Sequence, residues 1–491
     1  MHSSNPDDLK NISPLQVLLF TVFVLALLLP ISLFSDKGTV KIFGVPFRFL
    51  SSEKLFNPTK KEKKDITKII QKVDTLDLNR FDGKSDGNLG APGDGKFSAD
   101  AATEIYLSDL GRNNLARFFE KLSTVAEKKE KISIFHYGDS QIEGDRMTGY
   151  FRQRVQNQFG GNGPGLIPTV NVYKTMTFIQ NCSENFERYT AFWGEKLPSR
   201  KYGALFSVGT FKLDSLKNLA GEPTTAWIEI EPSKGAYTRA REYNNVTMYY
   251  NSCTASCMLK VLQNGKVIHE DTLVTDGAAH EVKLSFPSKP GKLRYVFSSK
   301  KSPVISGFCL EGDYGVQVHN VAMRGSSGTQ FGSVDYGLMK RMHDEQNTEL
   351  FILQFGGNSM PGMKDSSSVR GYVRSFKSQV NIVQKMRPEA AVIVVGPSDM
   401  SILNDGEFVT YPLLPYLVDQ MKKMSLEMGC GYYDIFGVMG GKNSMPSWVE
   451  QGLAARDYIH FTGSGVNIVA QLFFDAFIAE YAKWEQLEKA Q

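Results

Sequence analysis

Ile132 to Gln141 reads ISIFHYGDSQ, and this stretch decides the fold. Its first six residues are mostly apolar and rich in β-formers, which predicts a buried strand. Gly138, Asp139 and Ser140 then supply a tight turn, and a helix is predicted from about Gly144. Strand, turn and helix in this order indicate an α/β protein with Ser140 at the carboxyl end of a strand.

The same alternation returns in the last third of the chain. Apolar runs of strand length alternate there with stretches whose apolar residues have helical spacing. The predicted elements are a strand at 350–355, a helix at 369–386, a strand at 391–395, a helix at 413–428, a short strand at 432–436 and a helix at 463–487. This pattern predicts a largely parallel sheet covered by helices on both faces.

Helical periodicity is lost from about Tyr173 to Asn320. Short β-rich stretches separated by Gly, Pro and Asn turns predict an antiparallel sandwich inserted into the α/β domain. The insert carries the aromatic residues Trp227, Tyr237, Tyr243, Tyr249 and Tyr250. Aromatic faces stack on sugar rings, but aromatic residues are also common in sandwich cores, and the core is the favoured interpretation for each one.

Leu15 to Phe34 is a run of twenty residues without a charge, long enough to cross a bilayer. No small-residue cleavage site follows it, so an uncleaved anchor is favoured over a signal peptide. Lys37, Lys41 and Arg48 after the run argue against export, but long domains translocate regardless of such charges. We therefore expect an exported domain behind a membrane anchor.

Composition excludes several classes of protein. The formal charge of +4 on 491 residues gives no footprint for nucleic acid. Five scattered cysteines do not form a disulfide framework, and no spacing of Cys and His indicates a zinc site. Cys253 and Cys257 either pair with each other or lie buried as free thiols.

A Gly-Asp-Ser triplet alone is weak evidence for a nucleophile, because a helix-capping serine is the more common outcome. The base is sought among seven histidines, of which His460 lies just ahead of the last predicted helix. Asp457, three residues earlier, can orient its imidazole toward Ser140. Candidate donors to a developing oxyanion are the Ser140 and Gly328 N–H groups and the Asn358 side-chain amide.

Four segments carry a family resemblance. They are Gly138-Asp139-Ser140, 324–328 (RGSSG), Gly356-Gly357-Asn358 and 457–461 (DYIHF). In this order they resemble the four blocks of SGNH (GDSL-like) hydrolases. The resemblance implies a flavodoxin-like three-layer α/β fold, with Ser140 as nucleophile, His460 as base, Asp457 as its partner, and Ser140, Gly328 and Asn358 as the oxyanion hole. Gln141 replaces the usual leucine of the first block.

The layout with a β-insert resembles peptidoglycan O-acetylesterases that carry a carbohydrate-binding-like insertion, and SGNH partners of membrane-bound O-acyltransferases. It implies an enzyme that removes or transfers O-acetyl groups on polysaccharide, with no cofactor or metal, at the inner membrane with the catalytic domain in the periplasm. A lipase-like or thioesterase activity and a non-catalytic glycan-binding subunit are the alternatives. The predicted parts are a tail (1–14), a transmembrane anchor (15–34), a stalk (35–104), the hydrolase domain (105–172 and 321–491) and the inserted sandwich (173–320).

Overall fold

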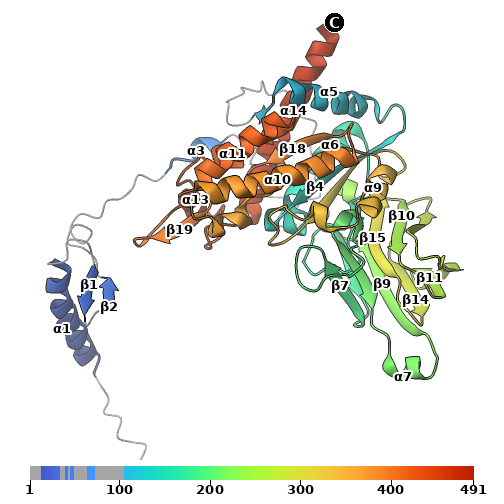
Figure 1. Cartoon of the computed structure of the whole chain (residues 1–491), viewed down its shortest axis with the longest axis horizontal. Helices are drawn as coiled ribbons and strands as arrows, with labels where there is room; N and C mark the ends of the chain where they lie inside the picture. The colour runs from blue at the N-terminus through green and yellow to red at the C-terminus, as the bar shows by residue number, and fades with distance from the viewer. Residues whose placement is uncertain (1–12, 34–38, 43–44, 49–63, 72–103, 491) are drawn as a thin grey trace, which may run out of the picture. The chain divides into compact units, whose positions relative to one another are not determined.

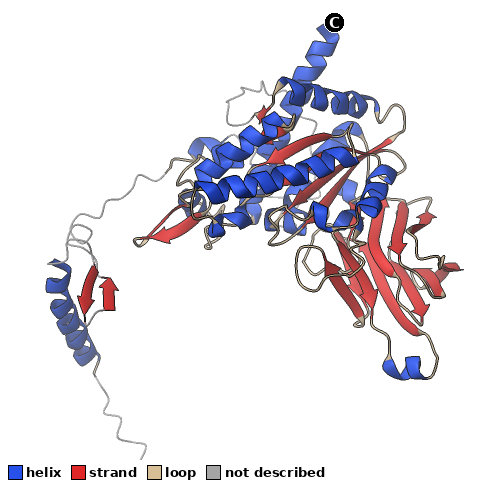
Figure 2. Ribbon diagram, in the orientation of Figure 1, coloured by secondary structure: helices blue, strands red, loops and turns tan. Residues whose placement is uncertain are grey.

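The computed structural model describes residues 13–33, 39–42, 45–48, 64–71 and 104–490. The chain divides into two units, 1–63 and 64–491. In the first unit, the described residues form helix α1 (Pro14–Leu33) and an antiparallel hairpin of β1 (Thr39–Ile42) and β2 (Val45–Arg48). All remaining elements belong to the second unit (Figures 1 and 2).

The predicted transmembrane anchor is wrong. No helix in the described part of the chain is long and apolar enough to cross a membrane. Helix α1 covers most of the predicted segment and contains Pro30. The predicted location at the inner membrane with a periplasmic catalytic domain, which depended on that anchor, is corrected with it.

A six-stranded sheet forms the middle layer of the second unit. Across the sheet the strands are β16 (Gly315–Ala322), β4 (Lys131–Gly138), β17 (Thr348–Gln354), β18 (Ala391–Val395), β21 (Gly431–Tyr433) and β3 (Ile105–Tyr106). Five strands are parallel, and only β3 at the edge runs antiparallel. Gly138 pairs with Ala322 on one side and Gln354 on the other, so these strands end together.

Alternating residues of β4 point to opposite faces of the sheet, as its pleat requires. Ile132 and Ile134 lie in one core, with helices α5 (Asp109–Thr124), α6 (Arg146–Phe159) and α14 (Gly463–Ala490). Phe135 and Tyr137 lie in the other, with α9 (Tyr336–Glu345), α10 (Ser366–Met386) and α11 (Leu414–Glu427). The prediction of an α/β chain with a parallel sheet and an antiparallel part is confirmed.

The antiparallel part is two sheets packed face to face. One has the order β13 (His280–Ser285), β10 (Asn245–Asn251), β15 (Val304–Glu311), β8 (Ser207–Phe211) and β7 (Phe186–Thr190), and β5 (Gly165–Ile167) also pairs with β15. The other has the order β12 (Lys266–Thr272), β11 (Cys257–Gln263), β14 (Leu293–Ser299), β9 (Thr224–Pro232) and β6 (Phe178–Cys182). Apolar side chains of both sheets meet in a third core.

The aromatic residues singled out in the insert mostly belong to its interior. Tyr243, Tyr249 and Tyr250 are buried. Trp227 is half-buried, and the guanidinium of Arg294 lies 4.4 Å from its ring centroid. Tyr237 packs against the core of the α/β layers. These five residues therefore form no exposed sugar-binding face. Cys253 and Cys257 are both free and buried.

The bounds of the sandwich differ from those predicted for the insert. The sandwich begins with β5 and ends with β15, so it spans 165–311, whereas the predicted insert spans 173–320. Residues 315–320 of strand β16 lie within the predicted insert, but the strand joins the parallel sheet. In the predicted stalk, Ile66 is buried in the α/β core, directly before helix α3 (Thr67–Gln71).

Short elements complete the second unit. They are the 3-10 helices η3 (Ser140–Asp145), η4 (Gly203–Leu205), η5 (Phe331–Ser333) and η6 (Gly357–Gly362), the helices α7 (Ser215–Leu219), α8 (Thr238–Arg241), α12 (Ile435–Val438) and α13 (Met445–Glu450), and the hairpin of β19 (Ser401–Asn404) and β20 (Glu407–Thr410).

Candidate active site

Loops from several strands meet at the carboxyl edge of the parallel sheet. Open α/β folds place their binding sites at this edge. A pocket of about 640 Å³ lies there, between the turns that follow β4, β17 and β18 and the loop ahead of α14. Ser140, Asn358 and His460 are among the residues that line it. Asp457 lies directly behind His460.

The turn after β4 exposes Ser140 to this pocket. Gly138 ends the strand where a side chain has no room, because an added Cβ would lie 2.9 Å from Ile142 and 3.2 Å from the Gln354 carbonyl oxygen. The Asp139 carboxylate caps the turn by accepting a hydrogen bond from the Gln141 N–H (2.9 Å). Ser140 is the first residue of η3, and the first N–H groups of a helical turn have no partner within it.

Ser140, His460 and Asp457 form one hydrogen-bonded chain. The Ser140 Oγ lies 2.9 Å from His460 Nε2, and His460 Nδ1 lies 2.8 Å from Asp457 Oδ2. This order of hydroxyl, imidazole and carboxylate is the geometry of a serine nucleophile with its base and orienting acid. The structure thus brings together the three residues predicted as the triad; their catalytic roles remain predictions.

The loop that carries the imidazole is held in shape by Asp457. Its Oδ1 accepts hydrogen bonds from the N–H groups of Ile459 (2.9 Å) and His460 (3.0 Å). Partial burial raises the pKa of Asp457, but the hydrogen bonds from His460 and Ile459 outweigh it, so the pKa lies below its usual value. Asp457 is therefore held as a carboxylate facing the imidazole.

The three candidate oxyanion donors differ in whether they face the pocket and in whether they already donate a hydrogen bond. The Ser140 N–H lies at the start of η3, beside the pocket. The Asn358 amide also lines the pocket, but its nitrogen donates to Asp139 Oδ2 and to the Ser326 carbonyl oxygen, both at 3.1 Å. The Gly328 N–H donates to Ser326 Oγ (3.0 Å), and Gly328 does not line the pocket.

Asp139 links the nucleophile turn to Asn358. Its side chain is buried, at 5% exposure, and it accepts from both the Gln141 N–H and the Asn358 amide. Burial raises the pKa of Asp139 to about 6, and the hydrogen bond from the Gln141 N–H opposes this rise. The carboxylate therefore fixes the amide of Asn358 at the wall of the pocket.

Two residues without a predicted role, Gln141 and Arg146, join the turn at Ser140 to the loop that carries His460. Gln141 Nε2 donates to the Ile459 carbonyl oxygen (2.9 Å). Arg146 donates from Nη2 to the Ser140 carbonyl oxygen (3.1 Å) and from Nη1 to the Phe461 carbonyl oxygen (3.3 Å). The replacement of leucine by Gln141 in the first block was the only signal in the sequence for either contact.

The other histidines of the α/β layers are structural. His136 is fully buried between Gln354 (3.0 Å) and Thr148 (2.9 Å), and burial lowers its pKa to about 4. His343 is buried against Tyr137. Among the residues that the structure describes, no group of three or more His, Cys, Asp or Glu side chains is placed to hold a metal ion.

No protein-family model and no curated protein sequence matches the chain. Among solved structures, a peptidoglycan O-acetylesterase is similar to it with a TM-score of 0.62 at 18% identity, over 77% of this chain and 99% of the other. An acetyl xylan esterase (TM-score 0.26, 14% identity, 33% and 81% covered) and a family two carbohydrate esterase from Cellvibrio japonicus (0.25, 9%, 62% and 99%) also match, at scores too low to bear on the fold. The chain has the fold of this peptidoglycan O-acetylesterase, which agrees with the resemblance of its four segments to SGNH (GDSL-like) hydrolases.

Proposed function

We propose that this protein is a serine ester hydrolase that removes acetyl groups from an O-acetylated glycan. The observation that carries the proposal is the hydrogen-bonded chain from Ser140 Oγ through His460 to Asp457, which opens on a pocket at the carboxyl edge of the sheet. A serine hydroxyl becomes nucleophilic when such a base can take its proton.

The reaction follows from the positions of these groups. Ser140 Oγ attacks the acetyl carbonyl carbon while its proton moves to His460 Nε2. The Ser140 N–H lies at the pocket wall, where it can donate to the resulting oxyanion. The Asn358 amide joins it by releasing one of its two present acceptors, Asp139 Oδ2 or the Ser326 carbonyl oxygen. The intermediate collapses, the bond to the sugar oxygen breaks, and His460 returns the proton to that oxygen. Water then attacks the carbonyl carbon of the acetyl-Ser140 ester while His460 takes a proton from it. The bond between the acetyl carbon and Ser140 Oγ breaks, His460 returns the proton to Oγ, and acetic acid leaves and ionises to acetate.

The acyl group and the glycan are supported by different observations. The pocket walls mix apolar side chains such as Phe355 and Met400 with the polar groups of Gln354 and Ser398, which suits a short acyl group better than a long chain. The glycan is supported by the likeness to the peptidoglycan O-acetylesterase, which extends over the sandwich because it covers 77% of this chain. His460 is more than a third exposed, so water reaches the acyl-enzyme.

The test is labelling of the nucleophile together with acetate release. A fluorophosphonate probe should label the wild-type protein and Ser367→Ala, a variant at an exposed serine, but not Ser140→Ala. Wild type should release acetate from p-nitrophenyl acetate and from acetylated glycan, and Ser140→Ala should release none while it keeps the wild-type circular dichroism. Labelling of Ser140→Ala would contradict the proposal.

A further inference from the structure

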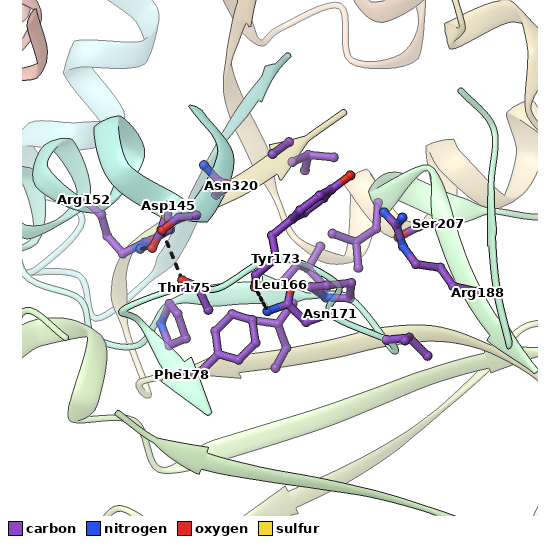
Figure 3. Close-up of a pocket in the computed structure, with 18 residues that line it drawn as sticks. Asp145, Arg152, Leu166, Asn171, Tyr173, Thr175, Phe178, Arg188, Ser207 and Asn320 are labelled. Atoms are coloured by element: carbon purple, nitrogen blue, oxygen red, sulfur yellow. Dashed lines mark hydrogen bonds and ion pairs between the residues drawn. The ribbon is translucent and has the colours of Figure 1, made fainter. Parts of the chain in front are cut away.

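A second pocket, of about 630 Å³, lies between the catalytic turn and the sandwich (Figure 3). Gly144 and Asp145 at the end of η3 line it, together with Tyr173 and Arg188 from the sandwich side. It shares no lining residue with the pocket at Ser140. Since η3 begins at Ser140 and ends at Asp145, this short helix contacts both pockets.

Arg188, on β7, brings an unpaired positive charge to this pocket. No carboxylate of the described residues forms an ion pair with it, and its Nε is buried without a hydrogen-bond partner. Its guanidinium carbon lies 5.9 Å from the ring centroid of Tyr173 and 5.8 Å from that of Phe192. A half-buried guanidinium that lies near two aromatic rings and hydrogen-bonds the Tyr173 side chain is held in place, with its Nε donor left for a ligand.

The carboxylates near the second pocket already form ion pairs with arginines other than Arg188. Asp145 accepts two hydrogen bonds from Arg152, at 2.5 and 3.0 Å, and one from Thr177 (2.6 Å). Glu143 accepts two from Arg324, both at 2.5 Å. Arg152 and Arg324 are thereby neutralised, and the positive charge of Arg188 remains.

Figure 3 shows Arg188 and Ser207 at one end of the pocket, Asp145 and Arg152 at the other, and Tyr173 between them. Arg188 is therefore separated from the Asp145–Arg152 ion pair by the length of the pocket.

Aromatic rings around Arg188 fit a sugar. The ring of Tyr173 has the Arg324 guanidinium over it at 4.7 Å, which fixes its orientation. Trp193, which follows Phe192 in the chain, is 75% exposed. Its loop is nonetheless ordered, because Thr190 Oγ1 bonds both the Trp193 N–H (3.0 Å) and its carbonyl oxygen (2.6 Å). Trp193 does not line the pocket, but an exposed indole on a fixed loop offers a flat apolar face to a saccharide ring that extends beyond it.

We propose that this second pocket binds the carboxylate of an acid sugar in the O-acetylated glycan, with Arg188 as the residue that pairs with it. The inference rests on the proposed function and deepens it, because it assigns an anionic saccharide as the substrate class. A guanidinium donates two parallel hydrogen bonds to a carboxylate, and a neutral sugar makes no such pair. Arg188 is thus a specificity-determining residue outside the catalytic chain.

The test compares substrates that differ only in the carboxyl group. The substrates are an acetylated uronic-acid oligomer and an acetylated oligomer of muramic acid, whose carboxylate is on a lactyl ether, each beside its carboxyl-reduced form. For at least one pair, wild type should have a higher kcat/KM on the acid form than on the reduced form. The pair that shows this difference identifies which acid sugar supplies the carboxylate. Arg188→Gln should lower kcat/KM for the acid form roughly 10- to 100-fold, mainly through KM, and leave the reduced form unchanged.

Two controls keep the test independent of folding and of the proposed activity. Arg294→Gln removes another guanidinium that lies over an aromatic ring, but one that is paired with Glu229, and it should not change the preference. Arg188→Gln should turn over p-nitrophenyl acetate like wild type, which shows an intact fold and catalytic chain. Equal losses on acid and reduced glycans, or no loss on either, would overturn the assignment of Arg188. Absence of acetate release from every substrate by wild type would instead contradict the proposed function.

Discussion

Asp457 uses both carboxylate oxygens on the segment that carries His460. One oxygen faces Nδ1 of the imidazole, and the other accepts from the Ile459 and His460 N–H groups. The carboxylate therefore shapes the loop and orients the ring at the same time. Asp457 does not line the pocket, so we expect it to make no contact with a substrate bound there.

Asp457→Asn should lower kcat for acetyl esters by roughly 10²–10⁴ with KM little changed. The amide keeps the size of the side chain, but it cannot support an imidazolium. Adding Asp457→Asn to Ser140→Ala should lower kcat almost no further than Ser140→Ala alone, because residues that act as one unit are strongly non-additive. Steady-state kinetics of the single and double variants measure this.

A second Asp–His pair provides the control for that variant. His280 Nε2 lies 2.8 Å from Asp276 on the sandwich. Asp276→Asn should leave kcat unchanged, because this pair does not line the pocket of Ser140. Near-normal rates in Asp457→Asn would mean that the base is oriented by another group.

Asp139 makes a pH-dependent contribution to stability. Its pKa is raised by burial to about 6, against 3.8 for the unperturbed group. Between these values the folded state binds more protons than the unfolded state, so the contribution of Asp139 to stability increases as pH falls. From pH 7 to 4.5, wild type should therefore gain about 2 kcal/mol relative to Asp139→Asn, as measured by urea unfolding.

Asp313→Asn is the control for this pH effect. Hydrogen bonds from Asn245 and Asn244 lower the pKa of Asp313, so its stabilising contribution is complete above pH 3.8 and is lost only as pH falls further. The difference between wild type and Asp313→Asn should stay constant from pH 7 to 4.5. A constant difference for Asp139→Asn as well would show that burial does not raise its pKa.

The residues of the site were predictable to different degrees. Ser140, Asp457 and His460 could be named because each stands in a short sequence pattern whose chemistry is local. The partners of Gln141 and Arg146 could not, since both bond backbone carbonyl groups more than 300 positions away, and any residue supplies a carbonyl. The hydrogen bond from Gly328 to Ser326 likewise depends on how the loop turns.

The hairpin of β19 and β20 supports, from outside, the loop that carries Asp457 and His460. The rings of Phe408 and Tyr458 are stacked with centroids 3.6 Å apart and planes within 10°. The Ser401 N–H also donates to the Tyr458 carbonyl oxygen (3.0 Å). Tyr458 needs such support, because it has φ +59°, which a side chain disfavours, and it lies between Asp457 and His460.

Phe408→Ala should lower kcat about 2- to 10-fold with little change in KM, since an aromatic pair contributes roughly 0.5–1.5 kcal/mol and the loop it holds carries the base. Leu403→Ala on the same hairpin is the control, because Leu403 is 60% exposed, and it should keep the wild-type rate. Equal effects of the two variants on kcat would show that the stacking does not position the loop.

The regular elements were predicted well where their pattern is unambiguous. Strand β18 has the predicted bounds 391–395, and the last helix begins at Gly463 as expected. Residues 315–320 of strand β16 fall inside the predicted insert, and the sequence does not separate them from it, since alternating apolar residues have the same period in either sheet. Only the pairing with β4 distinguishes the two, and a sequence does not contain strand pairing. The hairpin of β19 and β20 was missed because its strands have four residues each.

The sandwich and the α/β layers of the second unit share a core. Tyr249 and Val304 of the sandwich are buried in the same cluster as Tyr137 of β4 and Met342 of α9. The Tyr249 hydroxyl accepts a hydrogen bond from Gln346 (2.7 Å), and the Tyr137 hydroxyl donates to the Ala204 carbonyl oxygen (2.8 Å). The sandwich therefore packs directly against the α/β layers, and removing it would expose their buried side chains to water.

A destabilised sandwich should consequently inactivate the esterase. Tyr295 is fully buried between the two sandwich sheets, where its ring centroid lies 4.9 Å from that of Phe308, and it does not line the pocket of Ser140. Tyr295→Ala should destabilise the sandwich by about 3 kcal/mol or more, as truncation of a large buried side chain does. If the two parts unfold together, the temperature at which ester turnover is lost falls by several degrees, along with the calorimetric transition.

Tyr314→Ala is the matched control, because Tyr314 is 44% exposed, and its loss of turnover should follow the wild-type temperature. Independent domains predict a different result for Tyr295→Ala: a sandwich transition that moves down while ester turnover persists to the wild-type temperature. That outcome would mean that the contacts of Tyr249 and Ala204 are too weak to couple the two parts. If the calorimetric transition and the temperature at which turnover is lost shift together, the two parts unfold as one unit. A large truncation in the sandwich core then also disrupts the hydrogen-bonded chain of Ser140, His460 and Asp457.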